Sequence, residues 1–477
     1  MDIAIVGGGA AAVGLLDALA APAATEGGTG TITVFEPSPR LWRGRAYGPD
    51  LDSVLVNAPP AIMSIRSGDF GHYAAWLGER GAAHLDELLG QPLVPRALYG
   101  EYLEHTAEKA MAALAEQGRP VRVVAARVTG AARSGAHLVL RTHDGQEHRA
   151  THAALCVGGG APPDLHGLAG TPGFTADPYP LADTLDRVPV GSGVAIIGSG
   201  LTAVDVVVSL AARGHTGRIT LLSRGGALPH VWQRPDDLRP RHMTTDRVAE
   251  LHRARGGITL DDLTGLLRAE LADAGEDFDD LRADLAGAAS EDPVQRLRRQ
   301  LAAVDDPRTG RRLLQQTAHT VGPYAWRLLP ETDRAWLRRH LRTAAGVASP
   351  MIPRNATVLL RLLDSGQLTV ARGLRSIEPA DGGRFRVRVR DDGGERTAQT
   401  VVNAVNPPPQ AVPAAAGPLV RSLVETGLAT LHPAGGLIPA DPRVHVVGDL
   451  TGGGSFITSS VPGIAAQASR TAQALRT

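Results

Sequence analysis

The stretch VAIIGSGLTAVDVVVSL, residues 194–210, runs from an apolar segment through a glycine-rich turn into a second apolar segment. Its turn, GSGLTA at 198–203, has the Gly-x-Gly-x-x-Ala spacing that is typical of a strand, a phosphate-binding turn and a helix. The chain opens with a second copy of this pattern, DIAIVGGGAAAVGLLDALA at residues 2–20. Two such turns in one chain predict two dinucleotide sites.

Each position of the turn has a separate physical role. The first glycine permits the tight turn, the second lets the backbone approach a pyrophosphate, and the alanine keeps helix and strand close together. The free N–H groups and the partial positive charge of the helix N-terminus then attract the phosphates. The candidate positions are Gly7, Gly9 and Ala12 in the first copy and Gly198, Gly200 and Ala203 in the second. The alternative is an ordinary glycine-rich connection between a strand and a helix.

The residue after the next strand distinguishes the two ligands. In the first copy it is Glu36, whose carboxylate suits ribose hydroxyls and repels a 2′-phosphate. In the second copy Ser223 and Arg224 stand there, and an arginine pairs well with a phosphate dianion. We therefore expect FAD at the first site and NADPH at the second. The alternative for Arg224 is a surface arginine with no ligand.

The order of elements repeats along the chain. Each copy continues through a helix and a strand into an antiparallel hairpin, at 127–152 and at 375–398, and then into a closing strand. We predict an α/β fold with two Rossmann-like dinucleotide-binding domains of the glutathione-reductase and flavin-monooxygenase type, plus a helical insertion. The predicted ranges are 1–180 with 400–477 for the FAD domain, 190–230 with 346–400 for the NADPH domain, and 231–345 for the insertion.

The insertion differs in composition from the two dinucleotide domains. Its apolar residues recur at helical spacing, as in DDLTGLLRAELADAG at 261–275. It forms either a lid or wall for the substrate or a plain solvated helical segment. Near its start, Arg234, Arg239 and Arg241 are candidates for binding a substrate carboxylate, and a solvated basic loop is the alternative.

A late segment returns to the first domain. After a strand at 443–447, Gly448 and Asp449 precede a glycine-rich turn and a final helix, which Thr458-Ser459-Ser460 caps. In flavoproteins with two dinucleotide sites, such an aspartate bonds the ribityl chain, and the helix points its positive end at the flavin. A solvated loop aspartate is the alternative.

The overall composition excludes several classes of protein. The 477 residues include 49 basic and 49 acidic side chains, so net charge does not indicate a nucleic-acid or anionic-membrane partner. The single cysteine, Cys156, excludes an internal dithiol or a cysteine-based zinc site. No window reaches the ~18 apolar residues of a membrane span, and the first strand begins without a basic leader region. We expect a cytoplasmic protein and assign no metal ligand and no oligomeric state.

Five stretches resemble the bacterial FAD/NAD(P)-binding proteins related to flavin-dependent N-hydroxylating monooxygenases, including the amino-acid N-oxygenase and nitrosuccinate-forming types. The stretches are GRAYGPD (44–50), LVNAPPAIMSI (55–65), PRALYG (95–100), GSGLTAVDVVVSL (198–210) and VVGDLTGGGSFITSSVPGIAAQA (446–468). The resemblance implies that Arg45, Asn57, Met63 and Ser64 line the flavin, and we add Val128 to the candidate cofactor-binding residues. From the residues alone, Asn57 is equally well a turn residue.

The chain departs from this family at the end of the second unit. The Thr-Gly that usually closes the second unit is replaced by Val405-Asn406-Pro407. The stretch FTADPYP at 174–180 lacks the glycine and histidine of the Baeyer–Villiger fingerprint, which argues against ketone oxygenation.

These observations predict an NADPH-dependent flavin monooxygenase that uses O2 and a C4a-peroxyflavin to N-hydroxylate an amino acid or related small metabolite, as in secondary metabolism. The alternatives are an FAD-containing NAD(P)H oxidoreductase without oxygen insertion and a non-catalytic redox-sensing flavoprotein. No catalytic residue is assigned beyond the flavin-proximal candidates Asn57, Met63 and Ser64.

Overall fold

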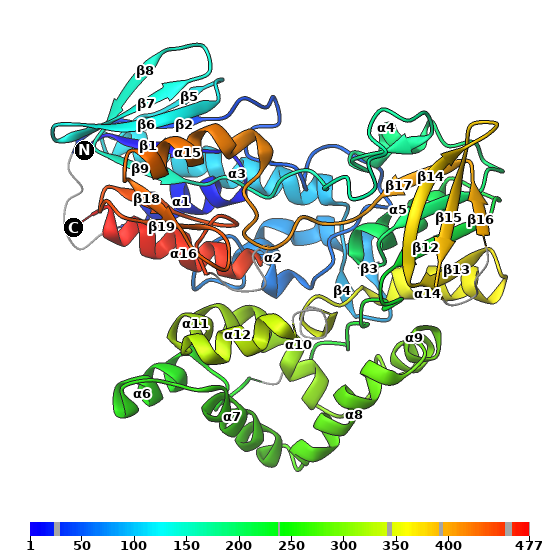
Figure 1. The fold of residues 1–477 in the computed structure, drawn as a ribbon. Helices are drawn as coiled ribbons and strands as arrows, with labels where there is room; N and C mark the ends of the chain where they lie inside the picture. Colours follow the sequence, from blue (N-terminus) through cyan, green and yellow to red (C-terminus); the bar gives the residue numbers. More distant parts are fainter. Residues whose placement is uncertain (23–28, 237–238, 341–345, 391–394, 454–459, 477) are drawn as a thin grey trace.

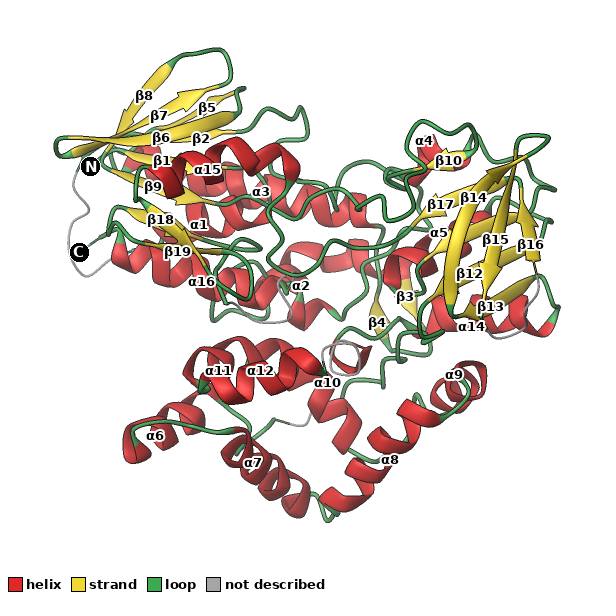
Figure 2. Ribbon diagram, viewed as in Figure 1, coloured by secondary structure: helices red, strands yellow, loops and turns green. Residues whose placement is uncertain are grey.

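The architecture consists of two parallel β-sheets, each with its own antiparallel sheet, and a separate layer of helices (Figures 1 and 2). This arrangement confirms the predicted α/β fold class. The computed structural model describes residues 1–22, 29–236, 239–340, 346–390, 395–453 and 460–476.

The first sheet has the strand order β20-β9-β1-β2-β5, with all neighbouring strands parallel. Its strands are β1 (Ile3–Val6), β2 (Ile32–Phe35), β5 (Val121–Val124), β9 (His152–Leu155) and β20 (Val444–Val446). Because parallel strands point the same way, the loops that follow them meet at one carboxyl edge.

Both faces of the first sheet are covered. Along β1, Ile3 and Ile5 pack into one apolar cluster and Ala4 and Val6 into another, because successive side chains of a strand point to opposite faces. The first cluster lies under α1 (Ala10–Ala20), α3 (Arg96–Glu116) and α16 (Val461–Ala474). The second lies under β6 (Val128–Ser134), β7 (His137–Thr142), β8 (Glu147–Ala150) and α15 (Gly417–Glu425). This double cover explains why the β1 residues are apolar without alternation.

The second sheet has the order β10-β17-β11-β12-β13 and is also parallel. Its strands are β10 (Phe174–Thr175), β11 (Val194–Ile197), β12 (Ile219–Ser223), β13 (Leu368–Arg372) and β17 (Thr400–Asn403). The helices α5 (Leu201–Ala212) and α14 (Pro353–Asp364) pack on it. The order β17-β11-β12-β13 reproduces β9-β1-β2-β5, as expected for a duplicated unit.

Two details differ from the prediction. Strands β10 and β17 both belong to the second sheet, although they fall within the ranges 1–180 and 400–477 that the sequence suggests for the first domain. The pairing of β10 with β17 joins segments more than 200 residues apart, and no local pattern in the sequence shows it. The predicted hairpins are three-stranded antiparallel sheets, β6-β7-β8 in one domain and β14 (Leu374–Ala380), β15 (Arg384–Val389) and β16 (Glu395–Ala398) in the other.

The described part of the insertion is helical and forms a layer beside both domains (Figure 1). Its helices are α6 (Thr245–Arg255), α7 (Leu260–Asp273), α8 (Phe278–Ser290), α9 (Pro293–Ala302), α10 (Gly310–Thr320), α11 (Gly322–Leu328) and α12 (Glu331–Arg339). Side-chain caps define several helix starts, including a capping box at Thr259 and Asp262. Among the described residues, no helix is long and apolar enough to cross a bilayer.

Short elements connect these layers. They are η1 (Pro60–Ile62), α2 (His72–Leu77), η2 (Gly78–His84), β3 (Leu85–Asp86), β4 (Gln91–Pro92), α4 (Leu181–Leu185), η3 (Ala414–Ala416), β18 (Ala429–Leu431) and β19 (Leu437–Pro439).

A buried ion pair joins the two domains. Arg96, the first residue of α3, donates from Nη2 to Oδ2 of Asp205 on α5 at 2.6 Å, and the side chains are 12% and 1% exposed. The hydroxyl of Tyr179, in the linker, donates to the same carboxylate and accepts from Nη1 of Arg96 at 3.1 Å. Nearby, the hydroxyls of Ser53 and Ser209 share a hydrogen bond of 2.8 Å. Hydrogen bonds and an ion pair therefore join the two domains at this place.

We predict that Asp205→Ala lowers the free energy of unfolding by about 3–5 kcal/mol, because it leaves the Arg96 guanidinium buried without its counter-charge. The double variant Arg96→Met/Asp205→Leu should recover most of that loss, because neither charge then remains to be desolvated. Urea denaturation followed by tryptophan fluorescence measures both.

The matched control is Asp186→Ala, which removes the exposed partner of Arg213 just beyond the end of the same helix and should have little effect. Equal losses in the single and the double variant would contradict the assignment.

Candidate cofactor-binding site

The carboxyl edge of the first sheet gathers the residues that the sequence singles out for the first dinucleotide. The glycine turn at 7–9 follows β1, Glu36 follows β2, Cys156 follows β9, and Gly448 lies two residues beyond β20. Since these strands are parallel neighbours, four loops that are distant in sequence lie side by side. The second sheet repeats this at its own edge, with the turn at 198–200 after β11 and Ser223 at the end of β12.

The first glycine of each turn has a positive φ that residues with a Cβ rarely adopt. Gly7 has φ +106°, and a Cβ built on it would lie 2.4 Å from the carbonyl oxygen of Cys156. Gly198 has φ +118°, and its Cβ would lie 2.8 Å from the carbonyl oxygen of Ala404. No side chain fits at either position without moving backbone. The two turns therefore share one geometry at equivalent positions in the two sheets.

The second glycine of each turn begins a helix. Gly9 and Gly200 are the N-terminal caps of α1 and α5, both in extended conformation, and neither helix has a side-chain cap among the described residues. Ala12 and Ala203 are fully buried at the contact between helix and sheet. The first N–H groups of both helices are thus left for an external acceptor, which is the arrangement that a pyrophosphate requires.

Glu36 lies directly beside the first glycine turn. Its Oε2 accepts from the N–H of Gly8 and its Oε1 from the N–H of Ser38, both at 2.8 Å. These bonds hold the carboxylate at the edge where the ribose of a nucleotide on α1 would lie. At the second edge, Arg224 is exposed just beyond β12, while the hydroxyl of Ser223 accepts from the N–H of Gly226 at 2.8 Å. The two edges thus present side chains of opposite charge.

The candidates Asn57, Met63 and Ser64 flank η1. The Oδ1 of Asn57 is buried and has no hydrogen-bond partner among the described residues, whereas its backbone oxygen accepts from Nε1 of Trp232 at 2.7 Å. Met63 and Ser64 are buried, and the Met63 oxygen accepts from the hydroxyl of Tyr99 at 2.8 Å. A buried acceptor without a partner is costly, so Asn57 fits a ligand that donates an N–H there, as an isoalloxazine ring can.

The other predicted cofactor residues have structural partners of their own. Arg45 forms an ion pair with Asp177 at 2.5 Å, which links the first domain to the interdomain connection. Val128 is buried at the start of β6. Gly448 has φ +94° and its N–H donates to Oε1 of Gln467 at 2.7 Å. The Asp449 carboxylate lies beside Gly159, in the loop after β9.

The insertion reaches this edge as well. Ser460 caps α16 as predicted, with Thr458 and Ser459 outside the described residues. His319 on α10 bonds Ser460, and Nε1 of Trp326 donates to the Gly453 oxygen at 2.6 Å. Sequence reasoning missed Trp232, His319 and Trp326, because none of them belongs to a spaced motif.

Of the three candidate arginines near the start of the insertion, one is ion-paired and two are exposed. Arg234 forms an ion pair with Asp305 at 2.5 Å and bonds the Glu87 oxygen. The side chains of Arg239 and Arg241 are exposed, and the Arg241 backbone N–H donates to Glu270. Arg234 is therefore already paired and does not offer a free guanidinium to a substrate carboxylate.

Residues 4–160 match the model of the FAD-NAD(P)-binding family. This part of the chain is a FAD/NAD(P)-binding domain. No curated protein matches the sequence significantly.

Solved structures with the same fold match this chain over nearly its whole length. They include L-lysine 6-monooxygenase from Pseudomonas syringae, at 16% identity and TM-score 0.56 over 99% of this chain and 98% of that chain. They also include the FAD-bound cadaverine monooxygenase DfoA from Erwinia amylovora, at 12% and 0.56 over 99% and 94%. A third is the ornithine N-hydroxylase KtzI from Kutzneria sp. 744, at 14% and 0.52 over 99% and 98%. These likenesses show that the chain has the same overall fold as these flavoprotein structures.

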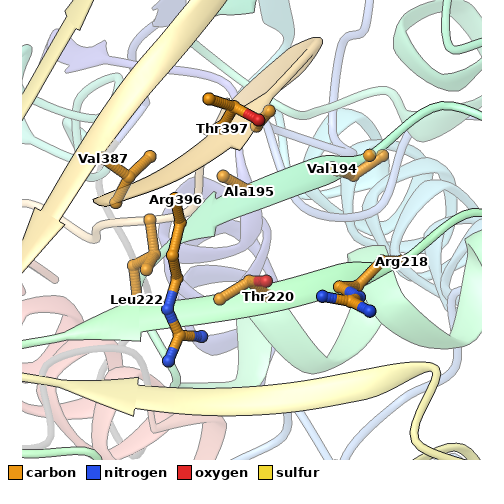
Figure 3. A pocket seen from close by; sticks show the side chains of 10 residues that line it. Val194, Ala195, Arg218, Thr220, Leu222, Val387, Arg396 and Thr397 are labelled. Atoms are coloured by element: carbon orange, nitrogen blue, oxygen red, sulfur yellow. The ribbon is translucent and has the colours of Figure 1, made fainter. Parts of the chain in front are cut away.

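A pocket lies away from the FAD/NAD(P)-binding edge. It lies on the second sheet beneath β15 and β16, and includes Arg218 and Thr220 below and Arg396 above (Figure 3). None of the predicted cofactor residues lines it. Among the described residues, no group of three or more His, Cys, Asp or Glu side chains could hold a metal ion.

The second turn offers a matched pair of variants. Gly198→Ala should lower the free energy of unfolding by more than ~1 kcal/mol, because its φ and the Ala404 oxygen both oppose a Cβ. Gly200→Ala has φ −85° and open space around it, so its stability should stay within ~0.5 kcal/mol of the original.

Gly200→Ala should nevertheless weaken NADPH binding, by about tenfold, because the new methyl group stands where the pyrophosphate approaches. Urea denaturation and fluorescence titration with NADPH measure the two effects. Unchanged NADPH affinity in Gly200→Ala would rule out a nucleotide at this turn.

Proposed function

We propose that this chain is an NADPH-dependent flavin monooxygenase that hydroxylates the nitrogen of an amino acid or a related small amine. The observation that carries the proposal is the pair of glycine turns. They share one geometry that only glycine fits, and they stand at the carboxyl edges of two sheets that a buried ion pair joins. One edge carries Glu36 and the other Arg224, which suits FAD at the first and NADPH at the second.

The arrangement of the two edges supports hydride transfer between them. Helix α3 runs into β5 at the amino edge of the first sheet, so its first residue, Arg96, lies toward the carboxyl edge. Helix α5 starts at the carboxyl edge of the second sheet, and Asp205 lies on its second turn. The Arg96–Asp205 pair therefore brings the two dinucleotide edges toward each other, as a flavin and a nicotinamide in contact require.

The bound FAD would supply the redox chemistry, accepting hydride from NADPH and activating O2. The residues of this chain would bind and orient the cofactor and exclude water: Glu36 would hold the ribose, Asn57 would present its Oδ1 to the ring, and Trp232 and Trp326 would cover the edge from the insertion. The solved structures that match this fold with a TM-score above 0.5 include enzymes named for lysine, cadaverine and ornithine oxygenation, which supports an amine as substrate.

Cys156 weighs against a disulfide reductase. It is the only cysteine of the chain, and burial raises the pKa of its thiol to about 12, so it stays protonated and has no partner for a dithiol cycle.

The function is tested by adding NADPH to the purified protein, first without and then with O2. We expect yellow protein, rapid loss of flavin absorbance without O2, and transfer of one ¹⁸O atom from ¹⁸O₂ to an amine. A panel that includes lysine, ornithine, cadaverine and aspartate, read by mass spectrometry, identifies the amine. Peroxide release equal to NADPH consumption with every amine would indicate an oxidoreductase without oxygen insertion, and absent bleaching would indicate a redox-sensing role.

Cofactor preference gives a second test. Arg224→Ala should raise the KM for NADPH about tenfold or more and leave the KM for NADH unchanged, because only NADPH carries the 2′-phosphate. The matched control is Arg218→Ala, an exposed arginine at the opposite end of the same strand, which should change neither value. Equal losses with both nucleotides would remove Arg224 from phosphate recognition.

A further inference from the structure

Three buried side chains tie the helical insertion to the FAD/NAD(P)-binding domain at its carboxyl edge. Trp232 donates to the backbone of Asn57, Trp326 to the backbone of Gly453, and His319 bonds the side chain of Ser460. The three insertion side chains are 4%, 3% and 9% exposed. Of these contacts, the one made by His319 is the only one that reaches a side chain at the start of α16.

The hydrogen bonds of His319 define its protonation. Its Nε2 lies 2.6 Å from the carbonyl oxygen of Ala348, which can only accept, so Nε2 carries the hydrogen. Burial lowers the pKa of His319, which keeps the ring neutral and leaves Nδ1 as an acceptor. The Ser460 hydroxyl therefore donates to Nδ1 at 3.2 Å, while its oxygen accepts from the N–H of Gly463 at 3.4 Å. Ser460 of α16 is thus the donor of this hydrogen bond, and His319 of the insertion is the acceptor.

Helix α10 is itself held firmly. Arg311, Gln315 and His319 are spaced by four residues, lie on one face of the helix and are all buried. The amide of Gln315 accepts from the N–H of Gln233 and donates to the oxygen of Val231, both at 3.0 Å. The ring of Trp232, which lies between Val231 and Gln233 in the sequence, stacks against the ring of His319 with the ring centroids 6.4 Å apart. His319 is thus a rigid anchor for Ser460.

We propose that His319 is a positioning residue: by fixing the Ser460 hydroxyl it holds the N-terminus of α16 in place at the cofactor, and so makes the reduction potential of the bound FAD depend on the helical insertion. This inference rests on the FAD site of the proposed function. The positive end of α16 would stabilise negative charge on a reduced flavin bound there, and because a helix dipole acts mainly within the first turn, the position of this turn would set the size of that stabilisation.

Two substitutions separate the two hydrogen bonds of the ring. In His319→Asn, the amide oxygen takes the position of Nδ1 and can still accept from Ser460. In His319→Gln, the amide nitrogen takes the position of Nε2 and can still donate to Ala348. Each variant loses one bond and keeps the other, so both should lose similar stability.

The measurement is the midpoint potential of bound FAD, in the full-length protein and without any amine. We expect a lower potential in His319→Gln and in Ser460→Ala, an unchanged potential in His319→Asn, and recovery in Ser460→Thr. The dissociation constant of FAD should rise about fivefold in His319→Gln, which corresponds to one lost hydrogen bond. The matched control is His230→Asn, a buried histidine that bonds Gln300 at 2.9 Å instead, which should leave the potential unchanged.

Equal potentials in His319→Gln, His319→Asn and the original protein would overturn this inference while leaving the proposed function intact. Equal shifts in the two His319 variants would also overturn it, because they would follow from lost packing and not from Ser460. An original protein that binds no FAD would instead overturn the proposed function itself.

Discussion

The ion pair between Arg96 and Asp205 is the contact on which the two-site arrangement depends. Each domain builds its own glycine turn from local sequence, but neither turn determines where the other one lies. The pair is buried, so its two charges must meet with good geometry, and Tyr179 adds hydrogen bonds to both of them. It therefore selects one relative orientation of the two sheets rather than adding general stability.

Other contacts near this ion pair also fix the orientation of the two domains. Val54, which precedes α3 in sequence, packs into the apolar core of the second domain. The carboxylate of Asp50 accepts from the N–H groups of Leu181 and Ala182 at the start of α4. A segment of the first domain thus forms part of the second, which makes a free rotation between them costly. The nicotinamide and the flavin would meet across an interface that is already formed before either one binds.

The sequence predicts what is local and misses what is long-range. Gly7, Gly198, Gly9 and Gly200 are recognisable because a tight turn between a strand and a helix needs those residues at that spacing. The membership of β10 in the second sheet is not recognisable, because two residues pair with a strand far along the chain. Trp232, His319 and Trp326 carry no motif either: each acts through one hydrogen bond to a distant segment, and isolated aromatic residues in a helical segment equally well indicate core packing.

The position of Cys156 links the fold to the type of reaction. Its backbone oxygen lies against Gly7, so this residue belongs to the wall of the glycine turn and contributes through its main chain. Since its thiol is buried and alone, electrons that reach the first edge cannot continue into a protein dithiol. An acceptor from outside the chain would have to reach an edge that Trp232, Trp326 and His319 border. The insertion, which is the least recognisable part of the sequence, therefore borders the place where the proposed reaction would occur.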